Sequence, residues 1–181
     1  MSVREGQRLL ACVLATVVAC SGTPSAESEG VRAIPPQSPP RFEEFAAEAI
    51  FRGAPAPIDL SGETARRFRT RLSAARAEGA NFAGRFALVT WGCGTACLSG
   101  ALLDLRSGAV HPLPIAPELG LDFRADSRLL IVHPPAEIAE QYPPGSERPA
   151  RVRSEYYVWS DSTSGWTLRA TIYPPPASSA R

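Results

Sequence analysis

The chain of 181 residues contains no lysine, so arginine supplies all 19 of its basic side chains. Its 18 acidic residues leave a formal net charge of only +1. Charges so balanced and evenly spread exclude the basic footprint of a nucleic-acid-binding protein. The densest run of arginines lies between Arg66 and Arg76, on a predicted helix. A solvated helix face explains this run more simply than a site for phosphate or lipid headgroups.

The sequence is also poor in residues that carry chemistry. It has two histidines, His111 and His133, and four cysteines. It contains no glycine-rich phosphate loop, Gly-x-Ser-x-Gly elbow or His-Glu-x-x-His pattern. Its cysteines and distant histidines also lack the ligand spacing of a zinc site. We therefore expect no metal, no cofactor and no catalytic residue of these classes.

No hydrophobic run is long enough to cross a bilayer. The apolar run from Leu9 to Ala19 spans about half the length that a transmembrane helix needs. Because Arg4 and Arg8 precede it, the run is typical of a secretory signal, which we expect to cover residues 1–19.

The end of this run, Val17-Val18-Ala19-Cys20, resembles the lipobox of bacterial lipoproteins. The resemblance implies cleavage before Cys20, a lipid on that cysteine and attachment to a membrane through the lipid. Cleavage nearby by ordinary signal peptidase is the alternative. By resemblance to known lipoprotein sorting rules, Ser21 after the cysteine favours the outer membrane, so we expect the protein on the periplasmic face of the bacterial cell envelope.

Composition divides the rest of the chain into three parts. Residues 20–40 are rich in proline and serine and predict an extended tether. Residues 41–173 are long enough for one core and predict a single domain. We expect residues 174–181 to form a disordered tail.

Hydrophobic periodicity predicts an α+β domain. Apolar residues at helical spacing predict two N-terminal helices, over residues 42–51 and 63–77. From Phe82 the period changes to two and predicts a five- to six-stranded antiparallel β-meander, because the connections are too short for parallel crossovers. The expected strands are Phe86–Trp91, Ala101–Arg106, Arg128–His133, Glu155–Trp159 and Trp166–Tyr173, with Val110–Leu113 as a weak edge strand.

The first and last of these strands differ in pattern. Phe86–Trp91 is apolar on both faces and is expected in the centre of the sheet, whereas Trp166–Tyr173 alternates and is expected to expose one face. The Asp126-Ser127 turn and the Tyr156–Trp159 segment also resemble hairpins of β-propeller blades. The domain is too short for a closed propeller, so we expect blade-like hairpins only.

The most distinctive stretch runs from Asn81 to Cys97 and has the sequence N-F-A-G-R-F-A-L-V-T-W-G-C-G-T-A-C. It resembles a group of secreted or lipid-anchored bacterial proteins that share the pattern F-A-G…L-V-T-W-G-C-G-T-x-C…G-A…D, then D-S-R-L-L and a final Tyr-Tyr-x-Trp. The likeness covers roughly residues 81–168. It transfers no activity and no catalytic residue to this chain.

Cys93 and Cys97 are expected to form a disulfide, because nearby thiols in an oxidising compartment are normally bonded. An extended strand would hold them too far apart, but Gly92 and Gly94 give the backbone freedom to fold back. The bridge would then pin the hairpin between the first two expected strands. A redox-active pair, a cysteine nucleophile and a metal site remain alternatives, centred on Cys93.

Other residues are weaker candidates for a site. Turn chemistry explains a set of polar residues at strand ends, Asp104, Asp122, Asp126 and Arg128. His133 is expected in a loop rather than as a general base. The tyrosine pair with Trp159 and Trp166 is expected in the core rather than in an exposed aromatic platform.

We therefore expect a non-catalytic, lipid-anchored envelope protein that acts as a binding or interaction module. Its partner would be another envelope protein or a cell-wall component. The contact would be made by a sheet face or by a binding loop formed by Trp91, Gly92, Gly94 and Thr95. The alternative is a thiol-dependent oxidoreductase or hydrolase centred on Cys93.

Overall fold

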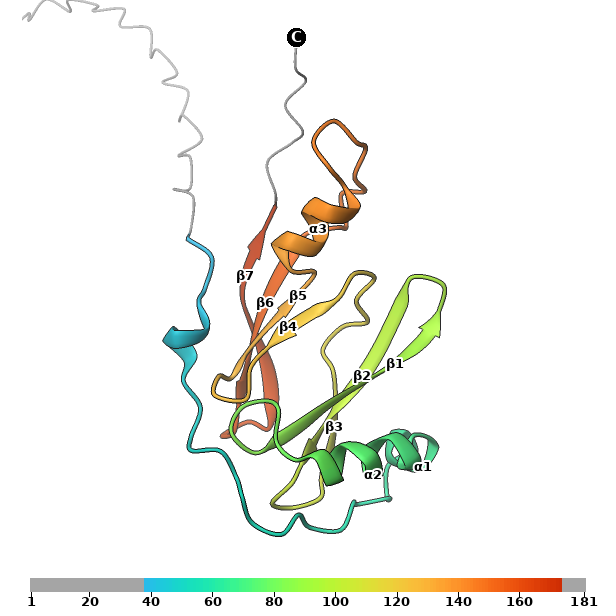
Figure 1. Ribbon diagram of the computed structural model, residues 1–181, viewed down its shortest axis with the longest axis vertical. Coiled ribbons are helices and arrows are strands. Elements are labelled where there is room, and N and C mark those ends of the chain that lie inside the picture. The colour runs from blue at the N-terminus through green and yellow to red at the C-terminus, as the bar shows by residue number, and fades with distance from the viewer. Residues whose placement is uncertain (1–37, 174–181) are drawn as a thin grey trace, which may run out of the picture. The chain divides into compact units, whose positions relative to one another are not determined.

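The computed structural model describes residues 38–173 (Figure 1). This part of the chain is an α+β fold with two antiparallel sheets, of three and four strands, neither of which closes into a barrel. The expected signal, Cys20, most of the tether and the tail lie outside the described residues. In chain order the elements are η1 (Phe42–Phe45), α1 (Glu63–Arg67), α2 (Arg69–Glu78), β1 (Phe86–Gly94), β2 (Cys97–Asp104), β3 (Val110–Pro112), β4 (Leu121–Phe123), β5 (Leu129–Val132), α3 (Pro135–Gln141), β6 (Ser154–Ser160) and β7 (Gly165–Ile172).

The single meander expected from the sequence is instead two consecutive meanders. Strands β1 to β3 pair in chain order, and β4 to β7 pair in chain order in the second sheet. Pro112, Pro114 and Pro117 have no backbone N–H to donate, which limits further pairing after β3. The chain therefore leaves the first sheet after the short edge strand β3 and crosses to the second sheet.

The main core lies between the two sheets. Side chains of both sheets are buried there together with Phe82 and Ala83: Phe86, Leu88, Leu102, Leu130, Val132 and Trp159. Trp159 meets Phe86 edge-on with 5.1 Å between ring centroids, a favourable arrangement for two aromatic rings.

Each sheet is also covered on its outer face. Leu72 of α2 and Ala65 of α1 pack against Ala87 and Leu103 on the three-stranded sheet. Phe42 of η1 packs on a second set of buried residues on the four-stranded sheet, Leu129, Ile131, Tyr156, Val158 and Ala170. The described domain thus has the layer order helices, sheet, sheet, η1.

β1 lies at an edge of its sheet, and β2 occupies the centre. The two apolar faces of β1 predict a central strand, but they have another cause. Ala87 faces the helices, whereas Leu88 faces the core between the sheets. A strand is apolar on both faces when layers cover it above and below, whether or not it has a neighbour on each side.

The alternation of β7 is interrupted by a bulge. Tyr156 pairs with Ala170 and Tyr157 with Leu168, so Arg169 is an extra residue without a partner on β6. Trp166 therefore joins the core between the sheets, while Ala170 joins the outer cluster under η1. The sequence pattern places both residues on one face, and the bulge moves them to opposite faces.

Neither N-terminal helix has its expected extent. Only residues Phe42–Phe45 form a helical turn, because the chain then pairs with distant backbone: Ala47 donates to the carbonyl of Asp126, and Phe51 to that of Gly84. The second helix is broken at Phe68, whose φ and ψ of −107° and 20° are not helical.

Candidate functional site

The candidate site is the hairpin tip, which we define as residues 92–97, where β1 turns into β2. Gly94 pairs with Cys97, and the register shifts at Cys93, which is a bulged residue of β1. Gly94 and Ala96 have positive φ angles of 149° and 50°. The tip is therefore a tight bulged turn in which the glycine allows a backbone conformation that other residues rarely adopt.

A disulfide joins Cys93 and Cys97, as the sequence predicts, with 5.2 Å between the Cα atoms. The bulge at Cys93 provides the fold-back that an extended strand of this spacing lacks. While the sulfur of Cys93 is bonded, it has no thiolate to act as a nucleophile or as a metal ligand.

The four residues expected to form the binding loop differ in exposure. Gly92, Gly94 and Thr95 are exposed, and a Cβ added at either glycine would meet no atom within 4 Å. Trp91 is only 5 % exposed and stacks on Phe68, with 3.8 Å between ring centroids. The tryptophan thus fixes the base of the tip against the helices, and the exposed surface is made by the smaller residues.

The F-A-G part of the motif is explained by backbone pairing. Ala83 and Gly84 have φ angles of 46° and 78°. Their N–H groups donate to the carbonyls of Ser127 and Ala125, in the turn that precedes β5. The Ser127 hydroxyl in turn donates to the carbonyl of Phe42 at 2.8 Å. This part of the motif and the D-S-R segment together join the two sheets to the N-terminal residues.

The aspartate of the motif, Asp104, belongs to an ion-pair cluster between the sheets. Arg85 contacts Asp104 at 3.2 Å and forms two hydrogen bonds to Asp161, at 2.9 and 3.0 Å. Trp159 Nε1 also donates to Asp161, at 2.8 Å. Burial alone would raise the pKa of Asp161, but the hydrogen bonds from Arg85 and Trp159 outweigh it and hold the pKa below its usual value. We name this cluster the Arg85 latch.

His111 lies next to the Arg85 latch but is not placed to activate a cysteine. Its ring contacts Trp159 with 5.0 Å between centroids, and burial lowers the pKa of His111 below its usual value. His111 pairs with Leu102 on β2, whereas Gly92, next to Cys93, pairs with Leu98. The separation along β2 is four residues, or roughly 13 Å, too far for a Cys–His pair.

His133 is a structural residue. It is 6 % exposed, and its Nε2 accepts a hydrogen bond from the backbone N–H of Glu118 at 3.0 Å. Its Nδ1 lies 3.1 Å from the carbonyl oxygen of Arg153 and donates to it, because the carbonyl can only accept. Neither ring nitrogen is left to act as a general base.

The aromatic residues near the end of the chain are largely core, as expected. Tyr156 and Trp159 are 2 % and 1 % exposed. Tyr157 is half-buried, and burial together with the hydrogen bond from its hydroxyl to Glu155 raises its pKa to about 12. These rings therefore do not form an exposed platform.

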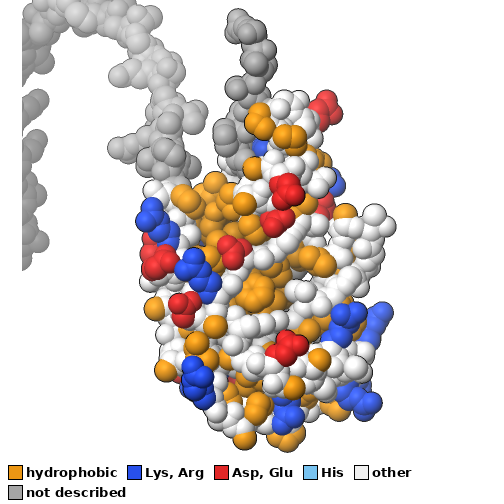
Figure 2. Space-filling view, viewed as in Figure 1, with side chains coloured by type: hydrophobic (Ala, Val, Ile, Leu, Met, Phe, Trp, Pro, Cys, Tyr) orange, Lys and Arg blue, Asp and Glu red, His pale blue; other side chains and the backbone are white. Residues whose placement is uncertain are grey.

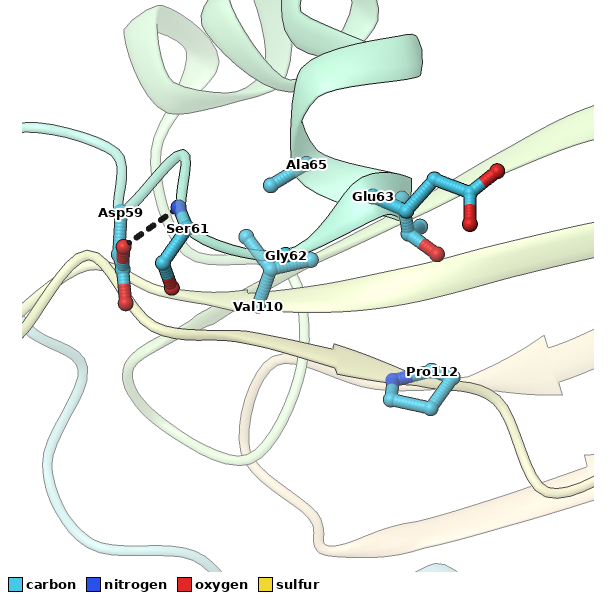
Figure 3. Close-up of a pocket in the computed structure, with 8 residues that line it drawn as sticks. Asp59, Ser61, Gly62, Glu63, Ala65, Val110 and Pro112 are labelled. Atoms are coloured by element: carbon cyan, nitrogen blue, oxygen red, sulfur yellow. Dashed lines mark hydrogen bonds between the residues drawn. The ribbon is translucent and has the colours of Figure 1, made fainter.

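A shallow pocket of about 270 Å³ lies between β3 and the start of α1 (Figure 3). Its lining comprises Asp59, Ser61, Gly62, Glu63, Thr64, Ala65, Val110 and Pro112. The Ser61 N–H donates to the Asp59 carboxylate at 2.9 Å, which lowers the pKa of Asp59. The sequence marks this segment only as a helix start, and nothing in its pattern predicts the pocket.

Within residues 38–173, no group of three or more histidine, cysteine or acidic side chains is placed to hold a metal ion. No helix in this range has the length and apolar character needed to cross a membrane. No family model matches the chain, and neither a curated protein nor a solved structure gives a match.

Proposed function

We propose that the protein is a non-catalytic interaction module of the bacterial cell envelope, which binds its partner through the hairpin tip. The supporting observation is a contrast within the motif. The F-A-G turn, Trp91 and Asp104 are used in pairing or packing inside the domain. Gly92 to Ala96 are exposed instead, although the disulfide gives them a defined shape. A fixed shape lowers the entropy cost of binding.

The partner in this proposal is another envelope protein or a cell-wall component. A test places a photo-crosslinking residue at Thr95 in the tip and, as a control, at Thr163 in the turn between β6 and β7, which is also exposed. Irradiation of intact cells should give a defined adduct from Thr95 and none from Thr163. Equal capture at both positions, or no adduct from Thr95, would contradict the proposal.

Attachment through Cys20 is part of the same proposal. It is supported by the lipobox-like Val17-Val18-Ala19-Cys20 and by the proline-rich composition of the residues that follow. A Cys20→Ala variant should lose membrane association or remain unprocessed, as judged by fractionation and by the mass of the mature N-terminus. Soluble wild-type protein with an N-terminus elsewhere would rule out the anchor.

A further inference from the structure

The free edge of β1 is covered only along its first half. The carboxamide of Asn81 accepts a hydrogen bond from the Leu88 N–H at 2.7 Å and donates to the Leu88 carbonyl at 3.1 Å. The N–H groups of Asn81 and Phe82 both donate to the carbonyl of Phe86. Residues 81 and 82 thus occupy the place that a neighbouring strand would take.

The second half of this edge is open. Backbone groups on a strand alternate in direction, so Thr90 and Gly92 point the same way as Leu88, away from β2. No backbone or side-chain group within residues 38–173 bonds to the outward N–H or C=O of either residue. Thr90 and Gly92 are both exposed. An extended peptide can therefore reach two outward residues of β1 without displacing any part of the described domain.

Arginines flank Phe68, which packs on the strand beside this open edge. Phe68, at the junction of α1 and α2, stacks on Trp91, which lies between Thr90 and Gly92 on the strand. Arg67 and Arg69 flank Phe68, and all three nearby arginines, Arg67, Arg69 and Arg71, are exposed. None of them forms an ion pair with a residue of the described domain. Figure 2 shows basic side chains gathered on this side of the molecule, near α1 and α2.

The other two arginines of the run serve the fold instead. Arg66 donates to the carbonyls of Leu60 and Ser61, and Arg76 to those of Pro55 and Ala56. Arg67, Arg69 and Arg71, around Phe68, form no such bond within the described domain. A guanidinium group there is available for a carboxylate, to which it binds in a bidentate manner.

We propose that the open edge of β1, at Thr90 and Gly92, binds an extended acidic segment of a partner protein as an added strand, with its carboxylates on Arg67, Arg69 and Arg71. Main-chain hydrogen bonds would supply the affinity, and side chains that alternate along the peptide would supply the specificity. The inference rests on the proposed function, because it names the chemistry of the partner that the neighbouring tip contacts.

The probe is a short fluorescein-labelled peptide in which valine and glutamate alternate, so that every carboxylate lies on one face of the added strand. Binding to the full-length protein is followed by fluorescence anisotropy. We expect saturable binding that weakens as salt is raised. A peptide with glutamine in place of glutamate, and one N-methylated at alternate residues, should each bind about tenfold more weakly or worse.

Variants of the protein separate the two contributions. Gly92→Pro removes an outward N–H on an edge strand, where proline is tolerated, and should abolish binding. Arg67→Ser combined with Arg71→Ser should weaken binding several-fold. Arg41→Ser removes a charge beside η1, on the opposite outer layer, and should leave binding unchanged. Thermal melting shows whether each variant is folded. The N-methylated peptide tests the same main-chain hydrogen bonds as Gly92→Pro, but on wild-type protein.

Equal binding of the glutamate, glutamine and N-methylated peptides would overturn the proposal, as would a complete lack of binding. A dimer that excludes the peptide would also overturn it, by identifying a second copy as the occupant. Failure of this edge-binding proposal can be distinguished from failure of the proposed function of the tip. If Thr95 crosslinks persist in the Gly92→Pro and arginine variants, the tip acts without the edge; if the peptide binds while Thr95 captures nothing, the edge acts without the tip.

Discussion

At the scale of single residues, glycines determine where the chain can approach itself. Gly108 lies in the turn from β2 to β3 with a φ of +80°, and a Cβ there would lie 1.8 Å from the carbonyl oxygen of Pro57. Its own carbonyl accepts a hydrogen bond from Asp59. The absence of a side chain thus lets the proline-rich segment before α1 lie against this turn.

A Gly108→Ala substitution should lower the free energy of unfolding by at least about 2 kcal/mol, because it combines a positive φ with a clash against backbone. Gly92→Ala is the matched control, since a Cβ at Gly92 meets nothing within 4 Å. Urea denaturation followed by tryptophan fluorescence measures both. Equal midpoints for the two variants would show that the segment around Pro57 is not packed on the turn.

Leu130 provides a test of the core between the sheets. Its side chain is fully buried there, so Leu130→Ala should cost about 2–5 kcal/mol of stability. Leu168 is 48 % exposed on the edge strand β7, and its replacement by alanine should cost less than about 0.5 kcal/mol. Similar losses at the two positions, in chemical denaturation, would contradict the exposed position of Leu168 on β7.

At the scale of elements, the hairpin of β1 and β2 is held at both ends. Its base packs between the helices and the second sheet through Ala87 and Leu88, and its tip is closed by the disulfide. Trp91 on Phe68 fixes the middle. The disulfide is therefore an addition to a hairpin that packing already holds.

Replacement of Cys93 and Cys97 by serine should consequently lower stability by about 2 kcal/mol or less, because the ring that the bond closes is small. Mass spectrometry of unreduced, alkylated protein gives the redox state directly. We expect neither cysteine to be labelled. Quantitative labelling of both cysteines would show that the disulfide is absent, and it would favour the alternative of a thiol-dependent enzyme.

Local sequence patterns predict the strands of this domain other than β4, but they do not predict which strands are neighbours. The periodicity around Leu130 and Val158 places both in strands, and Pro112 confines β3 to an edge. The helix expected after Phe42 stops at Phe45 because bonds to residues near Asp126 replace it. Such bonds join segments that are far apart in the sequence, and hydrophobic periodicity contains no information about them.

The same limit applies to the site. The glycines around Cys93 predict a closed tip, because they supply the backbone freedom that the bridge needs. The Arg85 latch is invisible in the sequence, since its partners Arg85 and Asp161 are 76 residues apart. The open edge at Thr90 also has no local signal in the sequence. That β1 has a neighbouring strand on one side and none on the other is decided only when the sheet forms.

At the scale of the whole molecule, the Arg85 latch connects the first sheet to the turn that follows β6. The guanidinium group also lies over the Phe86 ring, 4.6 Å from its centroid. Hydrogen bonds to two carboxylates stabilise the charge of Arg85 against the penalty of partial burial, and its pKa is raised. The latch thus makes the packing of one sheet on the other depend on ionised aspartate.

The pH dependence of stability tests this dependence. The pKa of Asp161 is lowered below its ordinary value in the folded protein, so the stability that its charge contributes is fully present near neutral pH and is lost as the pH falls through the lower folded pKa. Asp161→Asn should therefore be less stable than wild type at neutral pH. The difference in urea midpoints should shrink below about pH 4; a constant difference down to pH 2 would contradict an ionic role.

The N-terminal segment from Phe42 to Leu60 has a consequence for the kinetics of folding. Its backbone bonds reach Asp126, Gly84 and Gly108, whereas the hairpins form between neighbouring strands. Contacts of such large sequence separation close long loops and form late. Within the domain this segment is the first to be synthesised, yet its partners in the turn before β5 lie much later in the chain, so the first part of the domain to be made is among the last to acquire its native contacts.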